Sequence, residues 1–271
     1  MQALFLHTER SAGLGQDYRP EQFRPKPTGL TRRGFVPAAV AAGSALTIGG
    51  GFWLFNTQQR FSTRMGEVRV VALADGSVVT LNTASRMSVR FSRRQRLIRL
   101  LGGEALFDVA KDSSRPFLVA AGDLNVQAVG TSFTVRLIEG APAQVVVREG
   151  VVEVRNAASP RSEVVRLSAN MRGILAAENP VIAAAVPQSQ MQRELSWREG
   201  RIAFEGASLT DASMEFARYS DIRIVIDDPD LGREEISGSF QATDPVGFGR
   251  AVAEALGARV KVDQGEVHLL R

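Results

Sequence analysis

The chain of 271 residues contains no cysteine and only two histidines. Without cysteine it can form no disulfide bond, no thiol nucleophile and no thiolate metal site. The histidines are His7, near the start, and His268, in the last expected strand, and a lone histidine in a terminal strand is far more often structural or solvated than catalytic. The sequence therefore predicts no metal site and no cofactor.

Four carboxylates could in principle act as a general acid or base: Glu67, Asp75, Glu104 and Asp108. Each is expected in a turn or on the polar face of a strand, where exposure to solvent accounts for it. We therefore predict no catalytic residue and no enzymatic activity.

Charge is also absent from residues 34–59, which contain no Asp, Glu, Lys or Arg. A helix needs about 20 residues to cross the ~30 Å hydrocarbon core of a bilayer. Residues 36–55 supply that length and show no polar stripe, so the sequence predicts a transmembrane anchor over residues 35–56. No small-x-small cleavage site follows Gly51, while Trp53 and Phe55 suit the outer membrane interface, and we expect the anchor to be retained.

Two adjacent arginines precede this stretch. Arg32, Arg33 and Phe35 match a twin-arginine export motif, and the same pair would serve equally well as a positively charged cytoplasmic flank. Basic residues are more frequent just before the span than just after it, which favours a cytoplasmic N-terminus. We expect a single-pass protein of the cell inner membrane, with residues 1–34 as a short cytoplasmic leader and the bulk of the chain in the periplasm.

The formal net charge is +4, and "RFSRRQRLIRL" at residues 90–100 places five arginines in eleven residues. Such a run can indicate nucleic-acid binding. Here apolar residues alternate with the arginines, as in a strand with a solvated face, and an exported domain would not meet nucleic acid. We expect no nucleic-acid partner.

Short strand-like runs separated by turn residues extend over residues 64–178. Pairs of β-rich runs flank "ADGS" at residues 74–77 and "EG" at residues 149–150, and "RLIRLL" is expected to turn at residues 102–103 into "EALFDVA". No helical period is visible in this region. The pattern predicts an antiparallel all-β domain.

The pattern changes after this region. Pro180 and Pro187 with a Gln/Ser stretch predict a linker over residues 179–196. In residues 197–271, "SLTD" at residues 208–211 is typical of a helix N-cap, and "DP" at residues 244–245 would begin a second helix. The expected order β-α-β-β-α-β-β makes a small α+β domain with both helices on one face of one sheet, so the whole chain is predicted to be membrane-anchored and mainly β.

Several separate motifs resemble, in order, the FecR family of envelope sensor proteins. They are "GE" at residues 66–67, "LADGS" at 73–77, "LN" at 81–82, "GEALFDV" at 103–109, "RPF" at 115–117 and "VGTSF" at 129–133. The continuation from Trp197 resembles the family's C-terminal domain, which is similar to the short N-terminal signalling domains of secretins and TonB-dependent receptors. Most motif residues are expected to have structural roles in turns and in the core.

The resemblance implies an inner-membrane sensor and anti-sigma regulator. Its periplasmic part would receive a signal from the signalling domain of a siderophore-loaded TonB-dependent receptor, and its cytoplasmic part would bind an extracytoplasmic-function sigma factor. Members usually carry a longer, helical cytoplasmic domain, whereas residues 1–34 contain Pro20, Pro25 and Pro27 and no helical period. Either the true start lies upstream or direct sigma-factor binding is lost, and the alternative function is a membrane-anchored periplasmic scaffold without sigma-factor control.

Partner binding is expected in the C-terminal domain by addition of a strand to an open sheet edge. The candidate docking strand consists of Ile236, Ser237, Gly238, Ser239 and Phe240, because glycine permits close backbone approach. The alternative is that the two apolar side chains simply pack under the helices and that the glycine forms a bulge.

Overall fold

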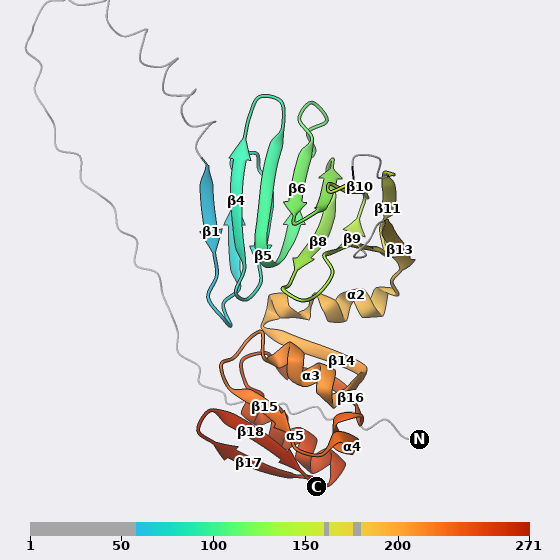
Figure 1. The fold of residues 1–271 in the computed structure, drawn as a ribbon. Helices are drawn as coiled ribbons and strands as arrows, with labels where there is room; N and C mark the ends of the chain where they lie inside the picture. The colour runs from blue at the N-terminus through green and yellow to red at the C-terminus, as the bar shows by residue number, and fades with distance from the viewer. Residues whose placement is uncertain (1–57, 160–162, 176–179) are drawn as a thin grey trace, which may run out of the picture. The chain divides into compact units, whose positions relative to one another are not determined.

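The computed structural model describes residues 58–159, 163–175 and 180–271, which form a large β domain followed by a smaller α+β domain (Figure 1). The prediction of a mainly β protein is confirmed. The strands of the β domain are β1 (Gln59–Ser62), β2 (Arg69–Ala72), β3 (Val78–Leu81), β4 (Arg86–Phe91), β5 (Arg96–Asp108), β6 (Phe117–Ala121), β7 (Leu124–Ala128), β8 (Ser132–Leu137), β9 (Gln144–Glu149), β10 (Val151–Asn156), β11 (Val165–Ser168), β12 (Met171–Leu175) and β13 (Val181–Ala185).

Strand β5 joins the two halves of this 13-stranded sheet. Its first part pairs with β4 and β6, and its second part pairs with β3 and β8. The first half of the sheet continues through β7, β10 and β11, and the second half through β9, β12 and β13. Residues 96–102 of β5 therefore pair with the first half and residues 103–108 with the second, so this one strand connects the two.

The two halves enclose one hydrophobic core, to which inward side chains from both contribute. Alternation along the strands selects these side chains, as the sequence pattern predicted. Phe107 lies fully buried at the centre, with its ring centroid 5.3 Å from that of Phe133 and 6.1 Å from that of Phe117. Close packing leaves no room at Gly173, where an added Cβ would lie 2.7 Å from Leu167 Cδ1.

A buried ion pair lies within this apolar core. Arg96 Nη1 donates to Asp75 Oδ2 at 2.7 Å, and the two side chains are 0% and 2% exposed. The guanidinium also donates to the carbonyl oxygens of Arg115 and Ala110, at 3.0 Å each. Asp75 in turn accepts from the backbone and the hydroxyl of Ser77, so the "DGS" turn and the arginine stretch are joined. The expectation that Asp75 and every arginine of the stretch are solvated is wrong.

Three details of the predicted antiparallel all-β domain are corrected. Strand β5 pairs with β6 in parallel. It runs on through residues 102–103 without a turn, because Gly103 adopts φ +90° and absorbs a local bend beside Ser85, where an added Cβ would lie 2.2 Å from the hydroxyl. Strands β9 and β10 flank Gly150 but do not pair with each other; β9 pairs with β8 and β12, whereas β10 pairs with β7 and β11.

The predicted linker over residues 179–196 is also corrected, since it contains a strand and a whole helix, which is followed by a 3₁₀ turn. Proline at residues 180 and 187 lies just before these elements rather than inside them. The C-terminal elements are α2 (Gln188–Glu194), η1 (Ser196–Glu199), β14 (Arg201–Ser208), α3 (Leu209–Phe216), β15 (Arg223–Ile226), α4 (Pro229–Gly232), β16 (Glu235–Gln241), α5 (Pro245–Leu256), β17 (Arg259–Asp263) and β18 (Glu266–Leu270).

The two expected helices begin at the predicted capping signals. The Ser208 side chain accepts from the backbone N–H of Asp211 at the start of α3, and Pro245 occupies the first turn of α5, which ends at Gly257 in the left-handed conformation. The single expected sheet is instead two sheets, β14 with β16 and β15 with β18 and β17, and the short helix α4 lies between β15 and β16. Phenylalanine rings fill the space between them, with Phe216 and Phe248 at a centroid distance of 4.4 Å.

Residues 35–56, the predicted anchor, lie outside the described residues. Within the described ranges, no helix combines the length and apolar character needed to cross a bilayer.

We predict that Asp75→Ala lowers the free energy of unfolding by about 3 kcal/mol or more, because it leaves the charge of Arg96 buried without a counter-ion. Urea unfolding followed by tryptophan fluorescence measures the change. The matched control is Glu153→Ala, which breaks the Glu153–Arg166 pair, whose arginine side chain is 77% exposed, and which should cost less than ~1 kcal/mol. Equal effects of the two substitutions would show that the buried pair has no special importance.

Candidate interdomain site

Four polar side chains join the β domain to the C-terminal domain: Asn82, Glu104, Arg218 and Tyr219, here called the Glu104 network. The amide of Asn82 donates to Glu104 Oε2 at 2.9 Å and to the Tyr219 hydroxyl at 2.8 Å. Arg218 Nη2 donates to the same Glu104 oxygen at 2.9 Å. One carboxylate that is only 6% exposed thus accepts hydrogen bonds from both domains.

Local structure brings these groups together. Asn82 comes directly after β3, and its backbone N–H donates to the carbonyl oxygen of Glu104 on β5 at 2.9 Å. On the other side, α3 ends at Phe216, and a turn closed by the hydrogen bond from Tyr219 N–H to the Phe216 carbonyl presents Arg218 and Tyr219. The end of a strand therefore meets the end of a helix.

A second contact lies beside the network. The hydroxyl of Thr83 donates to the carbonyl oxygen of Arg218 at 2.8 Å and accepts from the backbone N–H of Gly66 at the same distance. Gly66 adopts φ +74°, and an added Cβ there would lie 3.0 Å from the Tyr219 carbonyl oxygen. The glycine of the "GE" motif therefore permits both the turn and the close approach of the second domain.

The positive charge of Arg218 is stabilised in this site. Burial alone would lower the pKa of Arg218, but the carboxylates of Glu215 and Glu104 outweigh burial and raise that pKa above its ordinary value. Burial also raises the pKa of the Tyr219 hydroxyl. The guanidinium therefore stays charged and donates to Glu104, while the hydroxyl stays protonated at neutral pH and accepts from Asn82.

Apolar contact accompanies the polar network. Leu106 follows Glu104 on the same face of β5 and points away from the core of the β domain, yet it is fully buried. It belongs to the hydrophobic core of the C-terminal domain, against which Val68 also packs. The outward face of the second half of the sheet is therefore a docking surface for the C-terminal domain.

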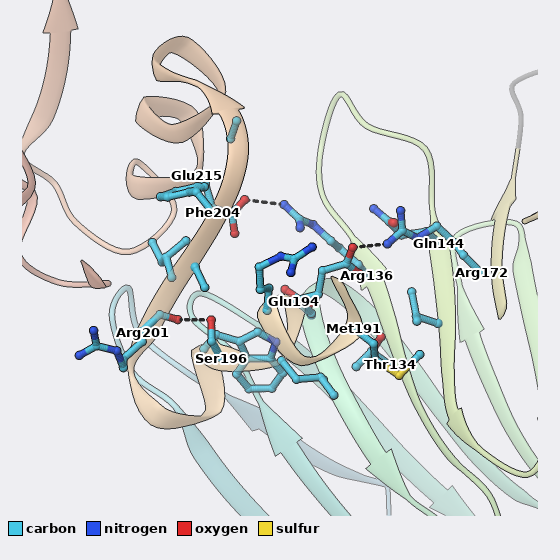
Figure 2. A pocket seen from close by; sticks show the side chains of 18 of the residues that line it. Thr134, Arg136, Gln144, Arg172, Met191, Glu194, Ser196, Arg201, Phe204 and Glu215 are labelled. Atoms are coloured by element: carbon cyan, nitrogen blue, oxygen red, sulfur yellow. Dashed lines mark hydrogen bonds and ion pairs between the residues drawn. The ribbon is translucent and has the colours of Figure 1, made fainter. Parts of the chain in front are cut away.

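A cleft of about 460 Å³ continues from the network between the two domains. Its walls come from β8, β9 and β12 on one side and from α2, η1, β14 and α3 on the other. Figure 2 shows Arg136 and Arg172 reaching from the sheet toward Glu215 and Glu194. Arg136 Nη2 lies 2.8 Å from Glu215 Oε2, and Arg172 is paired with Glu194, so ion pairs bridge the cleft.

The cleft is lined mainly by charged, polar and apolar side chains. Its lining contains arginines, carboxylates and apolar side chains but no histidine. Across the described residues, no cluster of His, Asp and Glu has the geometry to hold a metal ion. Glu215 pairs with both Arg136 and Arg218, so the cleft and the Glu104 network form one connected set of charges.

Comparison with known proteins agrees with this architecture. Residues 59–153 match the family model described as FecR protein, and the match begins at the first residue of β1. This part of the chain is therefore similar to the FecR family, and "FecR domain" below denotes the β domain that contains it. No curated protein is significantly similar to the chain.

Solved structures extend the likeness beyond the FecR domain. The chain is similar to two crystal structures, at 2.50 and 1.65 Å resolution, of a candidate anti-sigma factor from Parabacteroides distasonis ATCC 8503. In both cases the TM-score is 0.64 at 26% sequence identity, over 79% of this chain and 99% of that chain. The similarity thus covers far more than the FecR match.

The predicted export motif, Arg32, Arg33 and Phe35, lies outside the described residues. The predicted docking residues, Ile236 to Phe240, form most of β16. Ile236 is buried in the core of the C-terminal domain and Phe240 packs against that core, so both side chains have the packing role that was the alternative interpretation. The bulge of this sheet lies on β14, between Phe204 and Ala207, and not at Gly238.

Strand β16 pairs only with β14 among the described residues, so it has an open edge. Backbone N–H and C=O groups along an antiparallel strand point alternately toward and away from the paired strand. The N–H of Ala242 donates to the Gly200 carbonyl oxygen and so points toward the β14 side, which means that the N–H of Ser239, three residues earlier, points away from β14. The guanidinium of Arg201 donates to the Ser239 carbonyl oxygen at 2.7 Å and to its hydroxyl at 2.8 Å. An arriving strand would have to displace Arg201 from this edge, and docking at β16 stays a prediction.

Sequence reasoning missed the Glu104 network. Glu104 was expected on a solvated polar face, and the face was correct, but the C-terminal domain covers it. Asn82 and Glu104 both lie in motifs by which the sequence resembles the FecR family, and a carboxylate on the outward face within such a motif was the available signal. Arg218 and Tyr219 follow α3 with no pattern that distinguishes them from other turn residues.

We predict a coupling energy of about 1.5–3 kcal/mol between Glu104→Gln and Arg218→Met in a double-mutant cycle, because each group is buried against the other. Urea unfolding of the four proteins measures it. The pair Arg223–Glu266, whose arginine side chain is 73% exposed, is the control and should couple by less than ~1 kcal/mol. A cycle that closes to zero at Glu104 and Arg218 would contradict the assignment.

Proposed function

We propose that the chain is a FecR-type regulator of a sigma factor. The observation that carries the proposal is the likeness to the candidate anti-sigma factor across both domains, joined to the FecR match at residues 59–153. No arrangement of catalytic groups at the cleft favours a different class of activity. The proposal treats protein contact, rather than chemistry on a small molecule, as the work of the described domains.

In the full proposal, the chain is a single-span protein of the inner membrane that relays a signal from a TonB-dependent outer-membrane receptor to an extracytoplasmic-function sigma factor. The uncharged run at residues 34–59 and the surplus of basic residues before it support the anchor and its orientation. The resemblance of residues 197–271 to receptor signalling domains supports the receptor as partner. The receptor class would make the regulated process uptake of iron bound to a siderophore.

The interdomain site offers a physical route for such a relay. A partner that binds the C-terminal domain can shift the FecR domain only if it binds two arrangements of the pair with different affinity. The structure shows the Glu104 network with its buried charges paired across the interface, and the proposal adds a second arrangement in which these charges are separated and hydrated. The ion pair between Arg136 and Glu215 in the cleft is likewise formed only when the two domains are docked.

A second candidate function is a membrane-anchored periplasmic scaffold without sigma-factor control. It is favoured by the open edge of β16 and the charged cleft, which suit binding of protein partners and by themselves imply no control of transcription. The two functions differ in one consequence, which is whether loss of the chain changes transcription.

Deletion of the gene should change the activity of a reporter promoter that depends on the sigma factor encoded beside it, by severalfold or more. Restoring the full chain should restore the original level, and a chain that begins at residue 35 should not. A reporter that is insensitive to deletion would favour the scaffold and contradict the sigma-factor role.

Ser239→Pro should abolish binding of the signalling domain of the neighbouring TonB-dependent receptor, because proline removes an outward backbone N–H of β16. Ser237→Pro tests the next outward position, and Ser239→Ala is the control that keeps the N–H and should retain binding. Titration calorimetry measures affinity, and thermal unfolding checks that each variant folds. If both proline variants fold and bind with unchanged affinity, the docking edge is not β16.

A further inference from the structure

A group of exposed arginines lies on the half of the sheet opposite to the interdomain site. They project from β1, from β4, from the turn at residues 92–95 and from the first part of β5, and we call them the arginine face: Arg60, Arg86, Arg90, Arg93, Arg94 and Arg99. No Asp or Glu occurs in β1, in β6 or between the start of β4 and Leu101. Arg96 of the same stretch is buried with Asp75 and does not belong to this face.

Apolar side chains are interleaved with these arginines. Along β5, Leu97 and Leu101 share the outward face with Arg99, and Leu101 is 54% exposed. A basic surface with apolar side chains among the arginines is typical of proteins that lie at a membrane surface, where arginine meets phosphate and the apolar side chains enter the headgroup region. A single exposed leucine is ordinary on a soluble surface, so the cluster of arginines carries the argument.

The arginine face lies where the chain enters the domain. Strand β1 pairs with β4 so that Gln59 is opposite Val89, which places the turn with Arg93 and Arg94 at the end where β1 begins (Figure 1). The uncharged run at residues 34–59 leads directly into this strand. The C-terminal domain docks on β3, the second part of β5 and β8, and so leaves this face uncovered.

We infer that the arginine face binds the phosphate groups of anionic lipids in the same membrane that holds residues 35–56, an inference that rests on the proposed anchor. Guanidinium groups bind phosphate through paired hydrogen bonds. The short connection from the anchor to Gln59 keeps the face at high effective concentration near the headgroups. Docking would hold the FecR domain flat on the bilayer and leave the C-terminal domain available to a partner.

The test uses the full chain in vesicles of phosphatidylcholine with or without phosphatidylglycerol. Because the chain has no cysteine, Gln95→Cys carries a single fluorophore at the tip of the β4–β5 turn, and Ala251→Cys, at an exposed position of α5, carries it in the control. Lipids with a spin-labelled headgroup should quench the label at position 95 and not at position 251. Quenching should require phosphatidylglycerol and should disappear in ~0.5 M salt, where screening is strong.

Arg94→Glu combined with Arg99→Glu should reduce the ratio of docked to undocked molecules by at least about 25-fold, at roughly fivefold per arginine. The matched control reverses Arg223 and Arg233, whose side chains are each 73% exposed in the C-terminal domain, and should leave quenching unchanged. An unquenched label at position 95, equal quenching without phosphatidylglycerol, or no effect of the reversal would overturn the inference. Retention on duplex DNA in the presence of excess phosphatidylglycerol vesicles would also overturn it, in favour of nucleic acid.

Retention of the chain on vesicles after an alkaline wash measures the anchor separately. A chain that is washed off contradicts both the proposed topology and the inference. A chain that is retained with an unquenched label at position 95 contradicts the arginine face alone and leaves the proposed function intact.

Discussion

The carboxylate of Glu104 is the constraint on which the arrangement of the two domains depends. Its Oε2 atom accepts from Asn82 of its own domain and from Arg218 of the other, and nothing in the surrounding apolar contact could replace these bonds. A charge buried without a partner costs several kcal/mol. A small displacement of the C-terminal domain therefore cannot be accommodated gradually, and the interface is either formed or lost as a unit.

This all-or-none character extends beyond the network through Glu215. Because Glu215 pairs with Arg218 and with Arg136, the charges around the cleft depend on the same docking. Leu106 contributes buried apolar area, and this contribution does not depend on orientation. The ion pairs do depend on it and therefore fix how the two domains are positioned. Specificity of the arrangement thus comes from charge, and affinity comes largely from the covered apolar surface.

Local sequence patterns predicted what depends on nearest neighbours. Alternation identified the inward side chains, Asp75 and Gly76 indicated the first hairpin, and Ser208 and Pro245 indicated the two helices. Sequence patterns failed wherever a segment distant in the sequence decides the structure. Strand β5 continues past Gly103 because its second part pairs with β3 and β8, and Glu104 is buried because the C-terminal domain covers it. The sequence pattern predicts Arg96 at the surface, because nothing in the sequence indicates that Asp75 lies beside it in the folded chain.

The sharing of β5 between the two halves of the sheet has a consequence for the order of folding. This strand carries both Arg96 and Glu104, and its neighbours are drawn from β3, β4, β6 and β8, so its native contacts are mostly distant in sequence. Such topologies fold slowly, since loop closure precedes any gain from pairing. Glu104 lies in the part of β5 that pairs with β3 and β8, so the surface on which the C-terminal domain docks is complete only once these strands, which precede that domain in the chain, have paired.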